Sequence, residues 1–386
     1  MPIAVFALSL AAFCIGTTEF IISGILLQVS RDLGTDIPTA GLLVTGYAAG
    51  VAIGGPILGL MLTRMPLKPA ILGTIAIFAA GQFLCAIAPT YEMLLLARLV
   101  SACGHGVFFG VASVAVSQIA PPERRGAALS LLVGGITVAN ILGLPGGTAI
   151  GNLYGWRVAF VLIGIMALIA VVAIALTLKP PRRETEADAP LRVQASQLRH
   201  QTVFLTYLTI AIIMIGQVAF GTFQVALLTE VTHIEPLTLV PLYLLVGGAG
   251  AVAGIWTGGR LADWKIEPSI IGILLGQIVV FAVMLPLVGN GAAMLVLLFV
   301  SSFVGFGFST PVQIRILNSA KAAPRLAATM VSTAYNVGIA AGAFLGASLL
   351  RGGMGYGQLP ITGIVSSAVA LLVLLFSIQL SRRGIA

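Results

Sequence analysis

The sequence predicts an all-α integral membrane protein in which twelve transmembrane helices form two six-helix bundles. Three observations support this prediction: apolar runs of membrane-spanning length, two halves that resemble each other about 200 residues apart, and basic residues that gather on one side of the expected membrane. Of the 386 residues, 59% are hydrophobic and 8% are charged. A soluble domain of this size carries a far more charged surface, so we expect a protein embedded in a bilayer.

The apolar runs are each long enough for a helix to cross the roughly 30 Å hydrocarbon core of a bilayer, which takes about 20 residues. The N-terminus enters the first run without the basic region of a secretory signal peptide, so we expect no cleaved leader. The twelve expected spans cover residues 4–30, 38–62, 69–88, 92–118, 126–150, 157–178, 203–228, 238–260, 268–288, 292–316, 325–350 and 358–380.

One polar segment, from Lys179 to His200, interrupts the apolar runs and concentrates more charge than any other stretch. We therefore expect three parts in the chain. These are an N-terminal six-helix bundle over residues 1–178, a cytoplasmic linker over 179–202 and a C-terminal six-helix bundle over 203–386.

The two halves share short segments in the same order and at nearly the same offset. Because each half has an even number of spans, both repeats have the same orientation, and an axis along the membrane normal is expected to relate them. The matched segments are 59–64 with 259–264, 125–128 with 325–328, and 143–147 with 342–346.

Basic residues set the expected topology. Sixteen lysines and arginines flank the spans on the side that holds both termini, and three, Arg31, Arg157 and Arg351, flank them on the other side. Cytoplasmic loops carry the excess of basic residues, so we expect both termini in the cytoplasm, with the spans in the inner (plasma) membrane. The basic charge then serves topology, and we expect no nucleic-acid partner.

Three ionisable residues lie at membrane depth in the first half. Glu19 is near the middle of the first span, and Arg98 and His105 share one face of the fourth because they are seven residues apart. At a rise of 1.5 Å per residue, all three lie within about 10 Å of the bilayer centre. Charged residues at this depth are costly, which points to function.

Their chemistry suits proton transport. Low-dielectric surroundings favour a neutral carboxyl group, and a nearby guanidinium favours the carboxylate. We predict that Glu19 carries the proton, that Arg98 tunes it, and that His105 relays it or binds substrate. The alternative is a permanent Glu19–Arg98 ion pair that only fixes helix packing.

Uncharged polar residues dominate the spans of the second half and suit a neutral or weakly polar ligand. Aromatic side chains can add apolar walls. Interhelical hydrogen bonds and lipid contact are the alternatives for these residues. The candidate substrate-binding residues are Asn140, Gln217, Phe220, Gln224, Gln277, Tyr335, Asn336 and Phe108.

Glycines recur at every fourth residue in the eighth span (Gly250, Gly254, Gly258) and in the eleventh (Gly338, Gly342, Gly346). Such stripes allow close packing of helices in lipid. Packing alone is one interpretation, and movement of the second, fifth, eighth and eleventh spans against each other is the other. Pro145, beside two glycines, predicts a weak point in the fifth span.

The sequence lacks the motifs of an enzyme. Its three histidines, His105, His200 and His233, lie in different parts of the chain, and there is no His-Glu-x-x-His, no cysteine–histidine metal spacing and no phosphate-binding loop. We therefore expect no metal, no cofactor and no ATP-driven transport. No filter loop of a channel is visible either.

Several segments resemble motifs of the major facilitator superfamily over essentially the whole chain. Residues 59–64 and 259–263 resemble its signature loop and the second copy of that loop, and 98–106 resembles the arginine–glycine motif of the fourth span. Residues 143–147 resemble the glycine–proline motif of antiporters, and 155–160 resembles a further common segment.

Within that family, residues 16–20, 105–110 and 138–143 resemble the bacterial drug:proton antiporter branch, which includes sugar-efflux and chloramphenicol-resistance transporters. The resemblance implies export of a small molecule driven by proton entry. It also implies that Glu19 is the coupling carboxylate, with Arg98 beside it and His105 in the cavity.

One departure concerns the signature loop, which has Thr63 in place of the usual aspartate and Pro66 in place of glycine. In the family that aspartate caps a helix start, an anion at the positive end of a dipole. The resemblance leaves only Asp263 for this function, near Gly126. The expected gating residues are Asp263, Arg125, Gly143, Pro145 and Gly147.

Together these expectations describe a monomeric proton-coupled efflux transporter that works by alternating access. Its partners are a small-molecule substrate, protons and the lipid bilayer. The alternatives are a sugar or metabolite uptake permease, an uncoupled facilitator and, remotely, a membrane-embedded enzyme.

Overall fold

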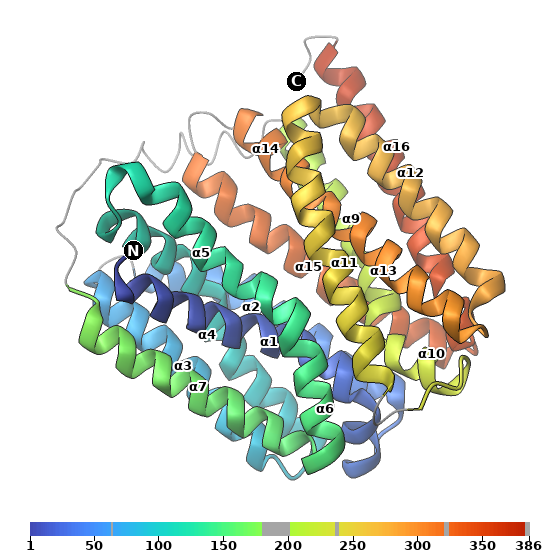
Figure 1. Cartoon of the computed structure of the whole chain (residues 1–386), viewed down its shortest axis with the longest axis horizontal. Helices are drawn as coiled ribbons and strands as arrows, with labels where there is room; N and C mark the ends of the chain where they lie inside the picture. Colours follow the sequence, from blue (N-terminus) through green and yellow to red (C-terminus); the bar gives the residue numbers. More distant parts are fainter. Residues whose placement is uncertain (63–64, 180–200, 236–238, 320–323, 383–386) are drawn as a thin grey trace. The chain divides into compact units, whose positions relative to one another are not determined.

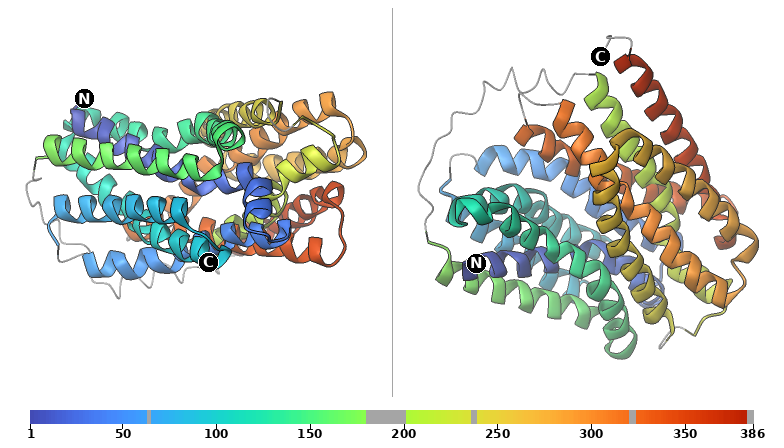
Figure 2. Two further views of the ribbon diagram at one scale, coloured as in Figure 1. Left: turned by 90° about the horizontal axis from the view of Figure 1, so that it is seen from below. Right: turned by 45° about the horizontal axis from the view of Figure 1, so that its top comes forward.

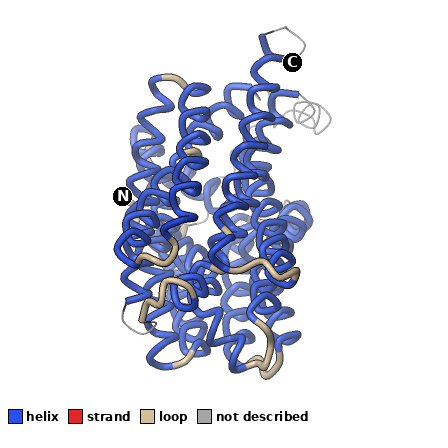
Figure 3. The backbone as a smooth tube through the Cα atoms, turned by 90° about the vertical axis from the view of Figure 1, so that its right-hand side faces the viewer, coloured by secondary structure: helices blue, strands red, loops and turns tan. Residues whose placement is uncertain are grey.

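The computed structural model describes residues 1–62, 65–179, 201–235, 239–319 and 324–382, and every regular element in these ranges is helical (Figure 3). The linker expected over 179–202 therefore lies almost entirely outside the described residues, and Thr63 lies outside them. The helices of the first half are α1 (Ile3–Asp32), α2 (Ile37–Leu62), α3 (Leu67–Ile87), α4 (Tyr91–Ile119), α5 (Arg125–Val138), the π-helical turn η2 (Ala139–Gly143), α6 (Leu144–Tyr154) and α7 (Trp156–Thr177). Those of the second half are α9 (Gln201–Thr222), α10 (Gln224–Glu230), α11 (Leu239–Trp264), α12 (Ile266–Met284), α13 (Gly291–Gly307), α14 (Ser309–Ser319), α15 (Pro324–Arg351) and α16 (Pro360–Arg382). Short 3₁₀ turns lie at Pro122–Arg124, Leu285–Leu287 and Tyr356–Gln358.

Twelve helical stretches of the described chain are long and apolar enough to cross a membrane. Each coincides within a few residues with a predicted span. The all-helical, twelve-span fold class predicted from the sequence is therefore confirmed. Three of the spans contain two α-helices each: α5 with α6, α9 with α10, and α13 with α14.

The chain folds into two compact units, the first built around α1–α7 and the second around α9–α16. In the first unit α1 is central, because it packs against α2, α5, α6 and α7, and α7 runs beside it in Figure 1. Helix α4 packs against α2 and α3. A helix surrounded in this way is apolar on all sides, which explains why α1 shows no polar face in its sequence.

In the second unit α9 holds the corresponding position and packs against α14, α15 and α16. Helices α12 and α16 pack against each other, and the right-hand view of Figure 2 shows the gold and dark red helices side by side. The central helix is again the first span of its repeat.

Glycines bring equivalent pairs of helices together in the two units. A Cβ on Gly55 of α2 would lie 2.9 Å from the Gly106 carbonyl oxygen of α4, and one on Gly254 of α11 would overlap the Phe303 carbonyl oxygen of α13. The second span of each repeat therefore approaches the fourth at backbone distance.

The first and fifth spans of each repeat meet in the same way. A Cβ on Gly143 would lie against Thr17 of α1, and one on Gly342 of α15 would lie 2.5 Å from the Ile215 carbonyl oxygen of α9. The glycine stripes of the eighth and eleventh spans thus pack against helices of their own unit, as the packing interpretation predicts.

The weak point predicted at Pro145 is present as the π-helical turn η2. Proline lacks an amide hydrogen and its ring displaces the carbonyl four residues earlier, here that of Ile141 inside η2. A wider turn accommodates this defect, and such turns are common at functional sites. In the second unit the breaks fall at Phe223, between α9 and α10, and at Phe308, between α13 and α14.

Arg315 is one of the sixteen basic residues counted on the side that holds both termini. It lies in α14, near the end of the tenth span, and is 5% exposed. Its Nη1 donates to Thr206 Oγ1 at 2.7 Å and its Nη2 to Ser377 Oγ at 3.0 Å, and it pairs with Glu267 at 3.8 Å. The hydroxyls of two neighbouring helices replace the water that a flanking arginine would bind.

Candidate functional site

The first unit contains a buried polar cluster between α1, α2, α3 and α4, with Arg98 of α4 at its centre. The Arg98 side chain is fully buried. Its Nε donates to the Leu43 carbonyl oxygen of α2 at 3.1 Å, and its guanidinium lies 4.5 Å from the centre of the Tyr47 ring. Among the described residues, Nη1 and Nη2 have no hydrogen-bonding partner. A buried guanidinium with two unbonded nitrogens is incompletely compensated. It can therefore bind an anionic group in another conformation of the protein.

Glu19 of α1 and Arg98 do not form an ion pair in this structure. They are nevertheless electrostatic neighbours, and Glu19 also interacts with Tyr47. The Glu19 side chain is partly exposed, whereas Thr18 before it is fully buried. The permanent ion pair offered as the alternative reading of these two residues is therefore absent here.

His105 lies two turns along α4 from Arg98 and is 4% exposed. Its Nδ1 is 3.1 Å from the Tyr47 hydroxyl, and its ring meets Phe109 edge-on at 5.8 Å. Tyr47 therefore links the two: its ring faces the Arg98 cation and its hydroxyl contacts the imidazole. The structure thus brings Arg98 and His105 to one tyrosine, and Glu19 is their electrostatic neighbour.

A second group of this cluster was not identified from the sequence. Gln82 of α3 accepts a hydrogen bond from Thr18 Oγ1 at 3.2 Å and donates one from Nε2 to Ser101 Oγ at 2.5 Å. All three residues are fully buried. A lone amide in the otherwise apolar third span was the available signal, but hydroxyl groups in spans are common and did not mark Tyr47, Thr18 or Ser101.

The second unit brings two of the predicted amides together. Gln217 of α9 donates from Nε2 to the Gly305 carbonyl oxygen of α13 at 3.0 Å. Gln277 of α12 accepts from Ser367 of α16 at 3.2 Å, and its Nε2 is buried without a partner in the described chain. A Cβ on Gly305 would lie 3.2 Å from the Gln217 nitrogen and 3.4 Å from that of Gln277, so the glycine leaves room for both amides.

Other predicted binding residues of this unit lie near the helix breaks. Tyr335 of α15 packs its ring 5.8 Å from Phe308, and its hydroxyl has no partner among the described groups. Asn336 donates to its own helix, to the Ser332 carbonyl oxygen, and leaves Oδ1 unpaired in the described structure. Phe220 meets Phe281 edge-on at 5.5 Å.

Three predicted binding residues are not brought to these clusters. Asn140 hydrogen-bonds the Ile136 carbonyl oxygen of its own helix at 3.2 Å, within the π-helical turn. Gln224 is the partly exposed first residue of α10. Phe108 is fully buried and packs edge-on against Phe109 at 5.2 Å, so apolar packing explains it.

The predicted gating residues divide into two kinds. Asp263 and Arg125 are exposed at helix ends. Gly143, Pro145 and Gly147 are buried, and the two glycines pack against Thr17 and Ile21 of α1.

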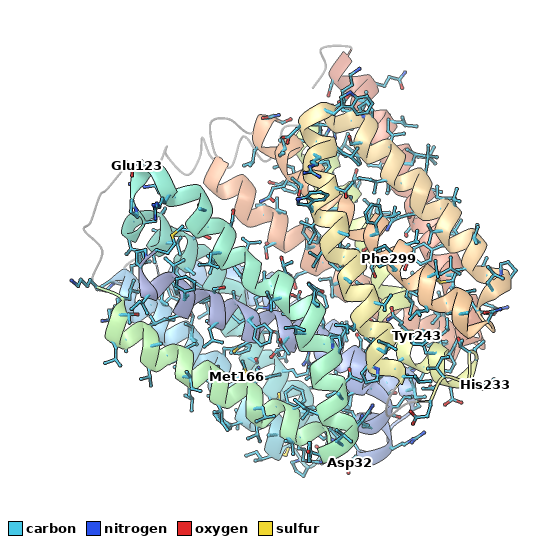
Figure 4. The ribbon with its side chains drawn as sticks, in the orientation of Figure 1. Asp32, Glu123, Met166, His233, Tyr243 and Phe299 are labelled. Atoms are coloured by element: carbon cyan, nitrogen blue, oxygen red, sulfur yellow. The ribbon has the colours of Figure 1, made fainter. Side chains whose placement is uncertain are left out.

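Polar contacts also close one end of the first unit, where Figure 4 shows Asp32 at the end of the bundle. Asp32 accepts hydrogen bonds from Arg157 and, at 3.0 Å, from Trp156 Nε1. Arg157 also donates to the Ala88 carbonyl oxygen at 3.0 Å. These contacts tie α1 and α7 to the end of α3. In the part of the chain that the structure describes, no three His, Cys, Asp or Glu residues are grouped so as to hold a metal ion.

Comparison with known proteins gives one family and a consistent set of relatives. The model of the Major Facilitator Superfamily matches residues 8–347. The inner membrane transport protein YdhP of Escherichia coli (strain K12) is 31% identical over 371 residues, which cover 96% of this chain and 95% of that protein. The chloramphenicol resistance protein of Streptomyces lividans is 31% identical over 379 residues, covering 97% and 95%. A probable sugar efflux transporter of Helicobacter pylori (strain G27) is 30% identical over 377 residues, covering 96% and 93%.

The fold also resembles that of solved structures. A bacterial homologue of the human lysosomal transporter Spinster, in an inward-facing and unoccupied conformation, matches with a TM-score of 0.76 at 17% identity, over 97% of this chain and 94% of that one. At this identity the likeness concerns the fold alone.

Proposed function

This chain belongs to the major facilitator superfamily and is a multi-pass inner membrane transporter, and from that premise we propose that it exports a small organic molecule, such as a drug or a sugar, in exchange for protons. The family is one of transporters and not an enzyme class. Relatives named for chloramphenicol resistance and sugar efflux support the outward direction.

Glu19 is the proposed proton carrier. It is the only carboxylate in the middle of a span, since the other acidic residues lie near span ends or between spans. It interacts electrostatically with the buried guanidinium of Arg98, which has two nitrogens without a partner among the described residues. When Glu19 is charged, Arg98 is the group that stabilises it, and when Glu19 is protonated the interaction weakens. This unpaired cation beside a lone carboxylate is the observation that carries the proposal.

His105 is proposed to assist through Tyr47, which contacts it at 3.1 Å. The substrate is proposed to contact the second unit through Gln217, Gln277, Tyr335 and Asn336, none of which carries a charge. In the described part of the chain, the last three each keep one polar atom without a hydrogen-bonding partner. Such groups suit a neutral ligand with hydroxyl or carbonyl groups. Phe220, Asn140 and Phe108 are weaker candidates because packing or their own helix accounts for their contacts. Gln224 is weaker because it lies at the partly exposed start of α10.

The halves 1–178 and 203–386 are proposed to alternate access as units, with 179–202 as a cytoplasmic linker and both termini in the cytoplasm. Asp263 is the proposed latch, the residue that holds the outward-open state. The weakened segment Gly143–Gly147 is the proposed point of bending. A single chain is proposed to suffice.

The test of proton coupling uses Glu19→Gln in reconstituted vesicles with an imposed pH gradient. A panel of neutral sugars and amphenicols, scored by thermal stabilisation of the purified protein, supplies the transported compound. We expect Glu19→Gln to abolish substrate accumulation driven by the pH gradient. Exchange of substrate across the membrane at equal pH should continue. Glu92→Gln, at the exposed start of α4, is the matched control and should transport normally. Undiminished accumulation by Glu19→Gln would show that Glu19 does not couple transport to protons.

A further inference from the structure

Gln82 occupies a particular place in the first unit. It belongs to α3, yet its two polar atoms bond two other helices: Oε1 accepts from Thr18 of α1 and Nε2 donates to Ser101 of α4. An amide is well suited to this position because it accepts at one end and donates at the other. A carboxylate in its place could only accept.

The two partners of Gln82, Thr18 and Ser101, are each close in sequence to residues proposed to couple transport to protons. Thr18 directly precedes Glu19 in α1. Ser101 lies between Arg98 and His105 at three and four residues, so all three share one face of α4. Ser101 is also a hydrogen-bonding neighbour of the Tyr47 hydroxyl, which in turn contacts His105. Gln82 therefore connects the turn of α1 that carries Glu19 with the face of α4 that carries Arg98.

The bonds are fully buried, which makes them costly to break separately. Thr18, Gln82 and Ser101 are all 0% exposed, and a buried amide that loses one partner keeps an unsatisfied group in an apolar bundle. The two bonds together fix the position of Thr18 relative to Gln82 and Ser101 in this structure. Interhelical hydrogen bonds of this kind are modest in energy, so position, more than stability, is their contribution.

We propose that Gln82 is a positioning residue for proton coupling: it holds the Glu19 turn of α1 in register with the Arg98–His105 face of α4. The proposal rests on the proposed proton-coupled function. Gln82 does not itself carry a proton. It sets the distance and orientation between the carboxyl group of Glu19 and the guanidinium, and so the proton affinity of the pair.

The titratable groups around Gln82 come from each packed helix. The α1 helix supplies Glu19, α2 supplies Tyr47, α3 itself supplies Cys85, and α4 supplies Arg98 and His105. Helix α7, which also packs against α3, has Arg157 as its charged residue, and this lies in its first turn paired with Asp32. The charges that respond to Gln82 are therefore Glu19 and the groups around Arg98.

The experiment titrates Glu19 in the purified full-length protein without substrate, by the infrared carbonyl band of its protonated carboxyl group. The band is assigned by its loss in Glu19→Gln. Gln82→Met keeps the length of the side chain and removes both bonds. We expect it to move the titration midpoint of Glu19 by about tenfold in proton concentration. Thr18→Val and Ser101→Ala should move it in the same sense, and adding either to Gln82→Met should have little further effect.

Thr74→Val is the control, because Thr74 is a buried hydroxyl of the same helix that bonds only its own backbone, at Ile71. It should leave the midpoint unchanged. An unchanged midpoint in Gln82→Met, with the Glu19 band present, overturns the positioning role and leaves the proposed function standing. A Glu19 band that does not titrate at all overturns both.

Discussion

The guanidinium of Arg98 lies 4.5 Å from the centre of the Tyr47 ring, and two of its nitrogen atoms have no partner in the described structure. An aromatic face and one carbonyl oxygen are weak compensation for a cation removed from water. This unfavourable burial of Arg98 lies in the first unit, in the electrostatic neighbourhood of Glu19, the one carboxylate at mid-span. This arrangement is expected of a functional cation more than of a structural one, and it makes the following predictions.

Arg98→Gln should separate stability from transport. Removing a buried, incompletely compensated charge is often neutral or stabilising, so the melting temperature in detergent should stay the same or rise. Accumulation driven by a pH gradient in vesicles should fall at least tenfold. A variant that unfolds at lower temperature yet transports normally would mean that Arg98 is a structural residue.

Tyr47 should show two separable contributions. Tyr47→Phe keeps the ring beneath Arg98 and loses the hydroxyl contact with His105, which costs about 1 kcal/mol of unfolding free energy. Tyr47→Leu also removes the ring and should cost roughly 2 kcal/mol more. Denaturant unfolding in mixed micelles measures both, and equal losses would exclude a contribution from the cation–ring contact.

Gly342 should tolerate no side chain. A Cβ there would lie 2.5 Å from the Ile215 carbonyl oxygen, so Gly342→Ala must separate α15 from α9, at a cost of about 1–3 kcal/mol. Gly272→Ala is the matched control, because nothing lies within 4 Å of its Cβ position. Thermal unfolding of the two variants should differ clearly, and a stable Gly342→Ala would contradict the close approach of these helices.

Arg315 should be structural. Arg315→Lys retains the charge but not the fork that donates to both Thr206 and Ser377, so we expect a loss of about 1–3 kcal/mol in unfolding free energy. Arg124→Lys, at an exposed position, should stay within about 0.5 kcal/mol of the wild type. If the two variants are equally stable, the buried bonds of Arg315 contribute nothing.

Asp263→Asn should favour the inward-open state if Asp263 is the latch. A cysteine introduced at Ser319, in a variant without the three native cysteines, reports this as faster labelling by a thiol reagent. Asp263→Glu keeps the charge and should label like the parent. Equal labelling of Asp263→Asn and its parent would mean that the aspartate does not latch.

The sequence was sufficient to predict the fold because each span can be recognised from its length and apolar composition. In a bilayer every backbone group must be satisfied within its own segment, so an apolar run of about 20 residues has a single structural outcome. The same reasoning placed Glu19, Arg98 and His105 at one depth, because depth follows from position along a helix of known rise. Pro145 likewise predicted a weak point in its span, which the structure shows as the π-helical turn η2.

The rotation of each helix about its own axis, and the helices it packs against, could not be predicted in this way. Gln82, Tyr47 and Ser101 joined the cluster only when α2, α3 and α4 packed together, since a bundle apolar on all sides gives no periodic signal of which face meets which helix. The burial of Arg315 was not predicted for the same reason, because it depends on two hydroxyl groups distant in sequence. Sequence alone therefore determined the number, length and depth of the spans and the rarity of charge within them. Which partner each charge has was decided only by tertiary packing, because hydrogen bonds between helices depend on rotations that the hydrophobic pattern leaves free.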